Sequence, residues 1–281
     1  PTYQNLCVGG QDAHEKDATN HLTWLCLAAL ADIRLSEPNF YVRVHPHTPQ
    51  DFLEASLKVA RLGFGMPAFV NDEIIIPSLE KKGVNHIDAL NYSTMGCVEV
   101  LVPGKWGYRA NGKSKLNVLK LVELAVNNGR DPATGLQLKK GNGCLTDLDS
   151  FDKVLHAWRE QLAFYTHAHV TADNINDQVL EEMVPNAFCS ALVQDCLERG
   201  KHLNAGGAVY DHTSGCLVGI INVGNSLEAI KTLVYERRLV ASAEYQEALE
   251  MNFEGARGQE IQQLILNHTP RYGEDQDEPD E

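Results

Sequence analysis

The sequence predicts an α/β fold. Segments with the helical spacing of apolar residues alternate with short apolar runs typical of strands along most of the 281 residues. Glycine, proline and asparagine mark most of the changes between them, and we find no internal repeat and no linker rich enough to separate two domains. Hydrophobic residues at 43% and charged residues at 22% indicate an ordinary globular protein with a sizeable core.

The first part of the chain is expected to alternate helices with short strands. Leu22, Leu25 and Ile33 keep a 3.6-residue spacing, and Thr48 followed by Pro49 is typical of a helix start. In chain order, we expect a helix at 20–35, a strand at 40–44, a helix at 48–62, a strand at 68–70, a helix at 73–82 with Pro77 near its start, and a helical turn at 88–90.

The later part is richer in helices. Residues 218–223 form a largely apolar run, with Asn222 within it, which we interpret as a strand buried on both faces. Asn225 with Glu228 forms a capping box. Residues 104–112 carry three glycines and suit a loop that lines a pocket. The expected elements are a helix at 116–127 closed by Asn128-Gly129, turns at 130–143, a helix from 151 into the 160s, a helix at 186–199, a strand at 218–223, and helices at 225–236, 243–253 and 259–266.

Charge and composition exclude several classes of partner. The net charge is −14, part of it from the acidic residues 274–281, so binding to a nucleic-acid backbone is disfavoured. No apolar run approaches the roughly 20 residues of a membrane helix, and no signal segment opens the chain. We therefore expect neither a nucleic-acid nor a membrane partner.

The seven cysteines do not form a disulfide or zinc pattern. Their number is odd, no Cys-x-x-Cys pair occurs, and no spacing of Cys and His fits a zinc site. This predicts no metal site and a reducing, cytoplasmic location.

One segment places a thiol beside a carboxylate. If residues 97–101 are extended, Cys97 and Glu99 project from the same face. Such a thiol can act as a nucleophile, a metal ligand or a hydrogen-atom carrier, with Glu99 as a general base. From spacing alone, a buried structural cysteine with a carboxylate at the rim remains an equal alternative.

The surrounding motifs resemble those of a known family. Gly96-Cys97-Val98-Glu99, followed by Pro103-Gly104-Lys105 and Gly107-Tyr108-Arg109, resembles the active-site Cys loop of the glycyl radical enzymes, in particular their dehydratase and lyase branch. Further matches run in family order from about Val8 to Gly273, among them Gly63-Phe64-Gly65-Met66-Pro67, Asn204-Ala205-Gly206-Gly207-Ala208 and Ser226-Leu227-Glu228-Ala229-Ile230-Lys231.

The resemblance implies a fold and a place in a longer protein. We expect the later part of a ten-stranded α/β barrel over residues 1–273, with the Cys loop inside it, and an acidic tail at 274–281 leading towards a glycyl radical domain. The radical-bearing motif, Arg-Val-x-Gly-Tyr, does not occur in these 281 residues. The expectation is therefore a fragment that is inactive alone and a homodimer when full length.

The resemblance also implies a mechanism. A glycyl radical, installed by an activating enzyme that uses S-adenosylmethionine and an iron–sulfur cluster, would take hydrogen from Cys97. The resulting thiyl would take hydrogen from a small hydroxylated substrate, and Glu99 would accept the hydroxyl proton as a leaving group departs. No bound cofactor is expected in the chain itself.

Three further residues are candidates for binding the substrate. Trp106 and Tyr108 are equally suited to a pocket wall or to the core. Arg109 could bind an acidic substrate through both guanidinium nitrogens, but a structural ion pair is the favoured alternative. Val100 departs from the family pattern that the resemblance implies, in which proline follows the glutamate in the dehydratases. Two alternatives remain: an activity like formate C-acetyltransferase, which uses two adjacent cysteines, and a non-catalytic half-barrel remnant.

Overall fold

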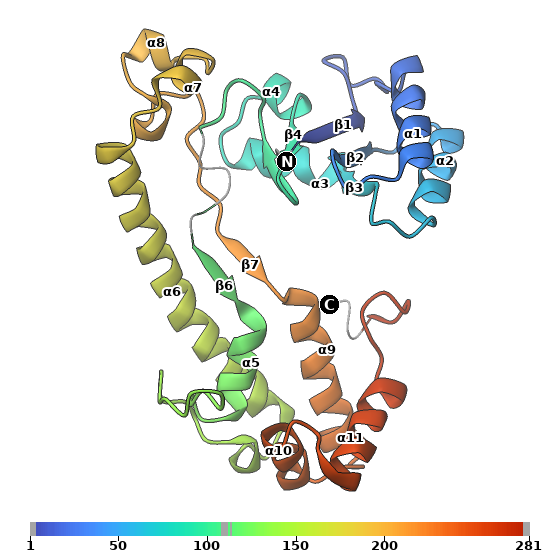
Figure 1. The fold of residues 1–281 in the computed structure, drawn as a ribbon, viewed down its shortest axis with the longest axis vertical. Helices are drawn as coiled ribbons and strands as arrows, with labels where there is room; N and C mark the ends of the chain where they lie inside the picture. The colour runs from blue at the N-terminus through green and yellow to red at the C-terminus, as the bar shows by residue number, and fades with distance from the viewer. Residues whose placement is uncertain (1–3, 108–111, 113, 278–281) are drawn as a thin grey trace. The chain divides into compact units, whose positions relative to one another are not determined.

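The computed structural model describes residues 4–107, 112 and 114–277. The chain divides into two compact units, residues 1–112 with 176–214 and residues 113–175 with 215–281. Both units combine helices with short strands (Figure 1), which confirms the α/β class predicted from the sequence.

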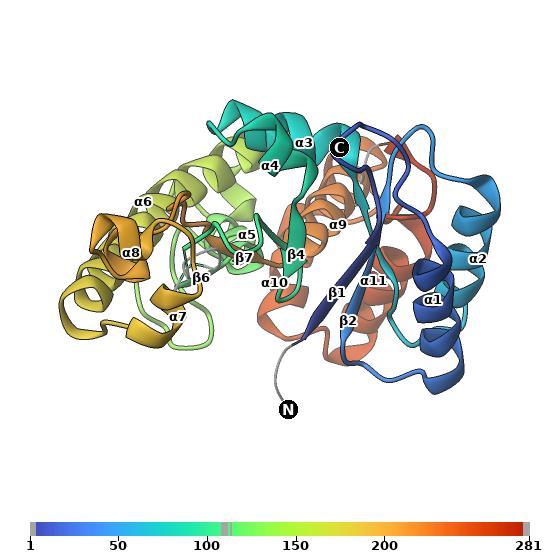
Figure 2. The same cartoon turned by 90° about the horizontal axis from the view of Figure 1, so that it is seen from above.

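A three-stranded parallel sheet organises the first unit. Its strands are β1 (Asn5–Gly9), β2 (Asn39–Val44) and β3 (Ala68–Asn71), in the order β1-β2-β3. Parallel neighbours need a crossover between them, and α1 (His21–Ile33) and α2 (Gln50–Ala60) supply the two crossovers. Both helices cover the same side of the sheet (Figure 2).

The central strand β2 separates an apolar face from a polar face. Successive strand residues point to opposite faces. Phe40 and Val42 are buried with residues of α1 and α2 in one hydrophobic cluster. Asn39, Tyr41 and Arg43 alternate with them and are also buried, so the second face of the sheet carries buried polar groups.

The other elements of the first unit follow the sheet and then return late in the chain. They are α3 (Asp72–Lys81), α4 (His86–Leu90), an antiparallel hairpin of β4 (Ser93–Met95) and β5 (Glu99–Leu101), α7 (Ala187–Ala191), α8 (Cys196–Arg199) and the 3-10 turn η3 (Leu203–Ala205). Leu79, Leu90 and Val102 share a core with Trp106 and Tyr210, so the returning segment packs on the residues that follow the hairpin.

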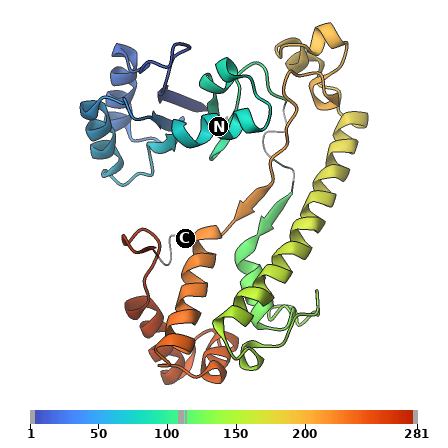
Figure 3. The same ribbon diagram turned by 180° about the vertical axis from the view of Figure 1, so that it is seen from behind.

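The second unit is mostly helical. A short parallel pair, β6 (Lys115–Asn117) with β7 (Cys216–Val218), leads into α5 and α9 (Figure 3). The remaining elements are α5 (Val118–Val126), the 3-10 turn η2 (Leu145–Asp147), α6 (Phe151–Met183), α9 (Ile220–Ile230), the π-helical turn η4 (Lys231–Glu236), α10 (Ser242–Glu250) and α11 (Gly255–His268). Apolar residues of α5, α6, α9, α10 and α11 form its core.

The strand predicted at residues 218–223 is wrong. β7 ends at Val218, Gly219 adopts a left-handed φ of 87°, and α9 begins at Ile220. Asn225 therefore lies inside a helix, and the capping box predicted there does not start one. The apolar run is shared between a strand end and the first turn of a helix, which periodicity over six residues cannot resolve.

Three helix boundaries also differ from the expectation. The helix predicted at 186–199 is broken into α7 and α8, with Asp195 at a left-handed φ of 74°. Thr48 does not cap α2; its hydroxyl accepts a hydrogen bond from the backbone of His45. Helix α6, expected to end in the 160s, extends to Met183. No helix in the described part of the chain has the length and apolar character needed to span a membrane.

Candidate active site

Cys97 lies at the tip of the β4–β5 hairpin. Met95 and Glu99 form the last pair of the ladder, and Gly96, Cys97 and Val98 make the turn. The expectation that residues 97–101 are extended is therefore wrong for its first two residues, because the strand begins only at Glu99. The Cys97 side chain is exposed at this tip.

The Glu99 side chain folds back over the turn. Its Oε2 atom accepts hydrogen bonds from the backbone N–H groups of Cys97, at 2.8 Å, and Val98, at 3.0 Å. Hydrogen bonds from N–H groups to a carboxylate are stronger than those between neutral groups. The carboxylate thus lies against the backbone that carries the thiol, through hydrogen bonds across a turn and not through alternation along a strand.

Two features of this turn require glycine at position 96. Its φ of 62° is in the left-handed region, where residues with a Cβ atom are disfavoured. A Cβ atom at this position would also lie 2.6 Å from Glu99 Oε2. A side chain at position 96 would therefore displace the carboxylate from the turn.

Three side chains from the polar face of the sheet converge on the Gly96 carbonyl oxygen. Asn5 Nδ2 and Asn39 Nδ2 each donate to it at 2.9 Å, and the Tyr41 hydroxyl lies 3.0 Å away. The same hydroxyl is within hydrogen-bond distance of the Cys97 carbonyl, and Asn5 Oδ1 accepts from Gly96 N at 3.2 Å. We call these three side chains the hairpin clamp.

Sequence reasoning missed the hairpin clamp. Asn39, Tyr41 and Arg43 alternate with the apolar residues Phe40, Val42 and Val44, and that alternation indicates a face of the strand that carries polar groups. Asn5 precedes the first element expected from the sequence, the helix at 20–35, and it lies opposite Asn39 in the β1–β2 ladder. The alternation was a usable signal for Asn39 and Tyr41, whereas the partner of Asn5 depended on strand pairing.

A buried ion pair holds the segment that precedes the β4–β5 hairpin. Arg43 binds Asp72 through Nε and Nη2, both at 2.9 Å, and donates through Nη1 to the Tyr92 carbonyl at 3.2 Å. The Tyr92 hydroxyl donates to Asp72 at 2.7 Å, and its ring lies under the guanidinium, 4.0 Å from centroid to Cζ. This network ties β2 to α3 and to the residue that precedes β4.

Burial and charge shift the pKa values in this network. Burial alone would lower the pKa of Arg43, but the hydrogen bonds and charge of Asp72 outweigh it and raise that pKa above its ordinary value. Burial, followed by the hydrogen bond to Asp72, raises the pKa of Tyr92. Both shifts keep the Arg43 guanidinium charged and the Tyr92 phenol neutral at neutral pH.

The comparisons with known proteins place this hairpin in a family. Residues 1–281 match the family model described as pyruvate formate lyase-like. The chain belongs to this family. It is 41% identical over 285 residues to the "Probable dehydratase YbiW" of Escherichia coli strain K12, covering 100% of this chain and 35% of that protein.

Solved structures agree. The glycerol-bound form of the B12-independent glycerol dehydratase from Clostridium butyricum matches with a TM-score of 0.84 and 36% identity, over 100% of this chain and 35% of that one. A glycyl radical enzyme from Archaeoglobus fulgidus matches with a TM-score of 0.82 and 31% identity, over 99% and 35%. The resemblance to glycyl radical enzymes and the expectation of part of their fold are confirmed, and the chain spans 35% of the length of these relatives.

Of the three predicted substrate contacts of this pyruvate formate lyase-like chain, Trp106 is the one that lies within the described residues. Trp106 is 9% exposed, packs against the rings of Tyr210 and His212, and donates from its indole to the His212 carbonyl at 3.2 Å. It is thus part of a core with a satisfied N–H, and its role in substrate binding stays a prediction. Tyr108 and Arg109 lie outside the described residues.

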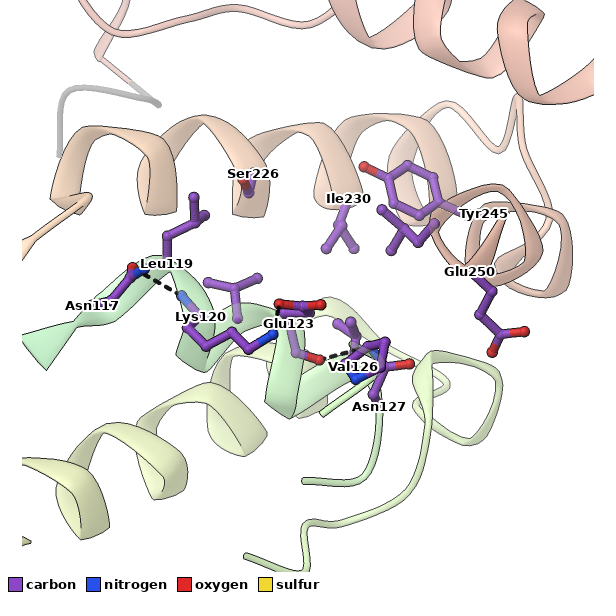
Figure 4. Close-up of a pocket in the computed structure, with 13 residues that line it drawn as sticks. Asn117, Leu119, Lys120, Glu123, Val126, Asn127, Ser226, Ile230, Tyr245 and Glu250 are labelled. Carbon is purple, nitrogen blue, oxygen red and sulfur yellow. Dashed lines mark hydrogen bonds and ion pairs between the residues drawn. The ribbon is translucent and has the colours of Figure 1, made fainter. Parts of the chain in front are cut away.

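A cavity of about 290 Å³ lies elsewhere in the family fold, between α5, α9 and α10 of the second unit (Figure 4). Its walls are mostly apolar, and at its rim the Lys120 ammonium binds Glu123 at 2.6 Å and Asp131 at 2.6 Å. None of the predicted site residues lines it. The cavity and the Cys97 hairpin are therefore separate features.

The remaining described cysteines differ from Cys97 in setting. Cys7 lies on β1, and burial raises the pKa of its thiol above the ordinary value. Burial likewise raises the pKa of Cys196, which is 2% exposed. No group of three or more His, Cys, Asp or Glu residues gathers to hold a metal ion within the described part of the chain. Among the described cysteines, Cys97 alone is exposed, on a turn whose backbone N–H groups bind a carboxylate.

Proposed function

We propose that this chain supplies the hydrogen-transfer site of a glycyl radical dehydratase or lyase. The observation that carries the proposal is the hairpin tip, where the Glu99 carboxylate lies hydrogen-bonded to the backbone of Cys97. Family membership supports it, because the chain matches a dehydratase and a glycyl radical enzyme over nearly its whole length. The radical itself would be carried by a glycine in an Arg-Val-x-Gly-Tyr motif, which does not occur in these 281 residues. An activating enzyme that uses S-adenosylmethionine would install it.

In this proposal Cys97 gives its thiol hydrogen atom to the glycyl radical and becomes a thiyl. The thiyl takes a hydrogen atom from a substrate carbon that bears a hydroxyl group, and Glu99 accepts the hydroxyl proton. The electron-rich carbon then expels a leaving group, with its bonding electron pair, from the neighbouring carbon. The product radical finally takes the hydrogen atom back from Cys97.

The substrate class follows from this chemistry. It is a small organic molecule with a hydroxyl group next to the carbon that carries the leaving group. Trp106, Tyr108 and Arg109 remain proposed substrate contacts, and the full-length enzyme is proposed to be a homodimer. A formate C-acetyltransferase-like activity is less well supported, because Gly96 and Val98 flank Cys97 where that chemistry needs a second cysteine.

The direct test replaces the thiol in the full-length, anaerobically activated protein. Cys97→Ser keeps the volume nearly constant but provides an O–H bond too strong to exchange hydrogen. Turnover of small diols and related alcohols should be abolished, while the glycyl radical signal in electron paramagnetic resonance remains. The matched control is Cys189→Ser, a half-buried cysteine outside the hairpin, which should keep turnover.

Two outcomes would refute the proposal. Turnover by the Cys97→Ser variant would show that another group transfers the hydrogen atom. A wild-type protein that forms no radical and turns over none of the alcohols would favour a non-catalytic remnant of the family.

A further inference from the structure

The peptide group between Gly96 and Cys97 is held from both of its sides. Its carbonyl oxygen accepts from the hairpin clamp, with Asn5 and Asn39 at 2.9 Å. Its N–H group donates to Glu99 Oε2 at 2.8 Å. One anchor consists of neutral side chains and the other of a carboxylate, so the two respond differently to a proton.

We propose that Asn5, Asn39 and Tyr41 are positioning residues that keep Cys97 in place while Glu99 carries the substrate proton. This inference rests on the proposed function, in which Glu99 is the base. In this role the three side chains matter most in the second half of the reaction, when Cys97 returns its hydrogen atom.

Protonation of Glu99 weakens one of the two anchors of the turn. An ionised carboxylate accepts hydrogen bonds roughly twice as strongly as a neutral group does. When Glu99 accepts a proton, its hold on the N–H groups of Cys97 and Val98 weakens. In the proposed reaction this happens before the hydrogen atom returns from the Cys97 thiol, so the turn would loosen when its geometry still matters.

The hairpin clamp does not respond to protonation of Glu99. Asparagine amides and a tyrosine hydroxyl keep their charge state when Glu99 is protonated. Asn39 is 8% exposed and Tyr41 is 1% exposed, so water competes little for their hydrogen bonds. Asn5 binds both the N–H and the carbonyl of Gly96, as a neighbouring strand would.

Pairing of β1 with β2 brings the three side chains of the clamp to the Gly96 carbonyl. Asn5 and Asn39 are partners in the parallel β1–β2 ladder. Tyr41 lies two residues beyond Asn39 and pairs with Cys7, so it projects from the same face of the sheet as Asn39. Strand pairing therefore delivers three donors to one carbonyl without any loop rearrangement. These rigid elements place a reacting group more accurately than a loop alone can.

The arrangement also separates the roles of the two Glu99 oxygens. Oε2 accepts both backbone N–H groups, whereas Oε1 has no hydrogen-bond partner among the residues that the structure describes. Oε1 is therefore the atom assigned to the substrate hydroxyl proton. Oε2 stays with the turn.

A double-mutant cycle in the full-length protein tests the clamp. Glu99→Gln imitates the neutral carboxyl group, and Tyr41→Phe or Asn39→Ala weakens the clamp. The readout is the protection of the hairpin amides, residues 96–99, in hydrogen exchange measured by mass spectrometry. Each single change should lower protection by about fivefold, as expected for one hydrogen bond of ordinary net strength. The combined change should lower it at least about tenfold more than the product of the two.

Kinetics of the activated enzyme provide the second arm. The Tyr41→Phe and Asn39→Ala variants should lower kcat and leave KM nearly unchanged, and deuterium taken from labelled substrate should reach the thiol but return to product less often. Asn85→Ala removes a comparable side-chain bond, the cap of α4, and should change neither readout. Tyr235→Phe is the matched hydroxyl control in the second unit.

The outcomes separate this inference from the proposed function. Protection losses that simply multiply, or a clamp variant with unchanged kcat and unchanged deuterium return, overturn the positioning role. The exchange cycle needs no turnover, so it can fail or succeed even if the Cys97→Ser test refutes the proposed reaction. Loss of protection throughout the first unit in Tyr41→Phe would also overturn it, because the hydroxyl would then be stabilising the fold and not the turn.

Discussion

Glu99 Oε2 accepts a hydrogen bond from the backbone N–H of Cys97 at 2.8 Å, so the proposed base is also a structural part of the turn that carries the proposed radical residue. A substitution at position 99 therefore changes both the proposed chemistry and the geometry of the turn.

Glu99→Gln should slow elimination far more than it slows hydrogen abstraction. The glutamine oxygen can still accept from the two N–H groups, but it cannot take the hydroxyl proton. Loss of a general base typically lowers the rate about 10²–10⁴-fold. The measurement is kcat for product alongside deuterium exchange from labelled substrate into the thiol. If exchange disappears together with product, Glu99 positions the turn and is not the base.

Gly96→Ala should destabilise the turn and displace the carboxylate. A left-handed φ costs a residue with a Cβ atom about 1–2 kcal/mol, and the added Cβ would lie 2.6 Å from Oε2. We expect faster exchange of the hairpin amides and a lower kcat. In a Glu99→Ala background the steric part should vanish, so the same substitution should cost less there. Equal costs in both backgrounds would assign the whole effect to the backbone.

Arg43→Met should be strongly destabilising, because it leaves the Asp72 carboxylate buried without its cation. Removing one member of a buried pair typically costs about 3–5 kcal/mol. The urea midpoint should fall, and adding Asp72→Asn should recover much of the loss by removing the stranded charge. Arg43→Lys should lie between, since a lysine cannot bind both carboxylate oxygens in the same fork. A double variant no more stable than Arg43→Met would contradict this account.

His86→Gln should lower stability at mildly acidic pH and not at alkaline pH. His86 Nδ1 lies 2.6 Å from Glu80 and Nε2 lies 2.9 Å from Glu15. The hydrogen bond with Glu80, followed by that with Glu15, raises the pKa of His86 above 6.5. A raised folded-state pKa contributes stability that is fully present below the unfolded-state pKa and is lost as pH rises through the folded-state pKa.

The corresponding measurement compares urea midpoints of wild type and His86→Gln at about pH 6 and about pH 9. The difference should be larger at the lower pH, and because the groups are exposed it should be modest and should shrink with added salt. His21→Gln, at the exposed start of α1, is the control. A difference that grows with pH would show that the histidine acts through a neutral contact.

The sequence determined the family and most elements of the first unit. The Gly96-Cys97-Val98-Glu99 motif and its companions predicted the glycyl radical enzyme fold, which the comparisons confirmed. The helix expected at 20–35 appears as α1, because its apolar period was long and had clear boundaries, and the strand expected at 40–44 appears as β2. The roles of Cys97, Glu99, Trp106, Tyr108 and Arg109 stay predictions.

Only the tertiary structure decided how Cys97 and Glu99 come together. Strand alternation predicted a shared face, whereas the chain turns at Gly96 and returns the carboxylate to the Cys97 N–H. The hairpin clamp likewise joins Asn5 and Asn39 to Gly96 across 91 and 57 residues of sequence. Local sequence preferences are set by neighbours a few residues away, so they specify helices and strands. A hydrogen bond between distant residues exists only after the strands have paired, and here that pairing fixes where the thiol lies.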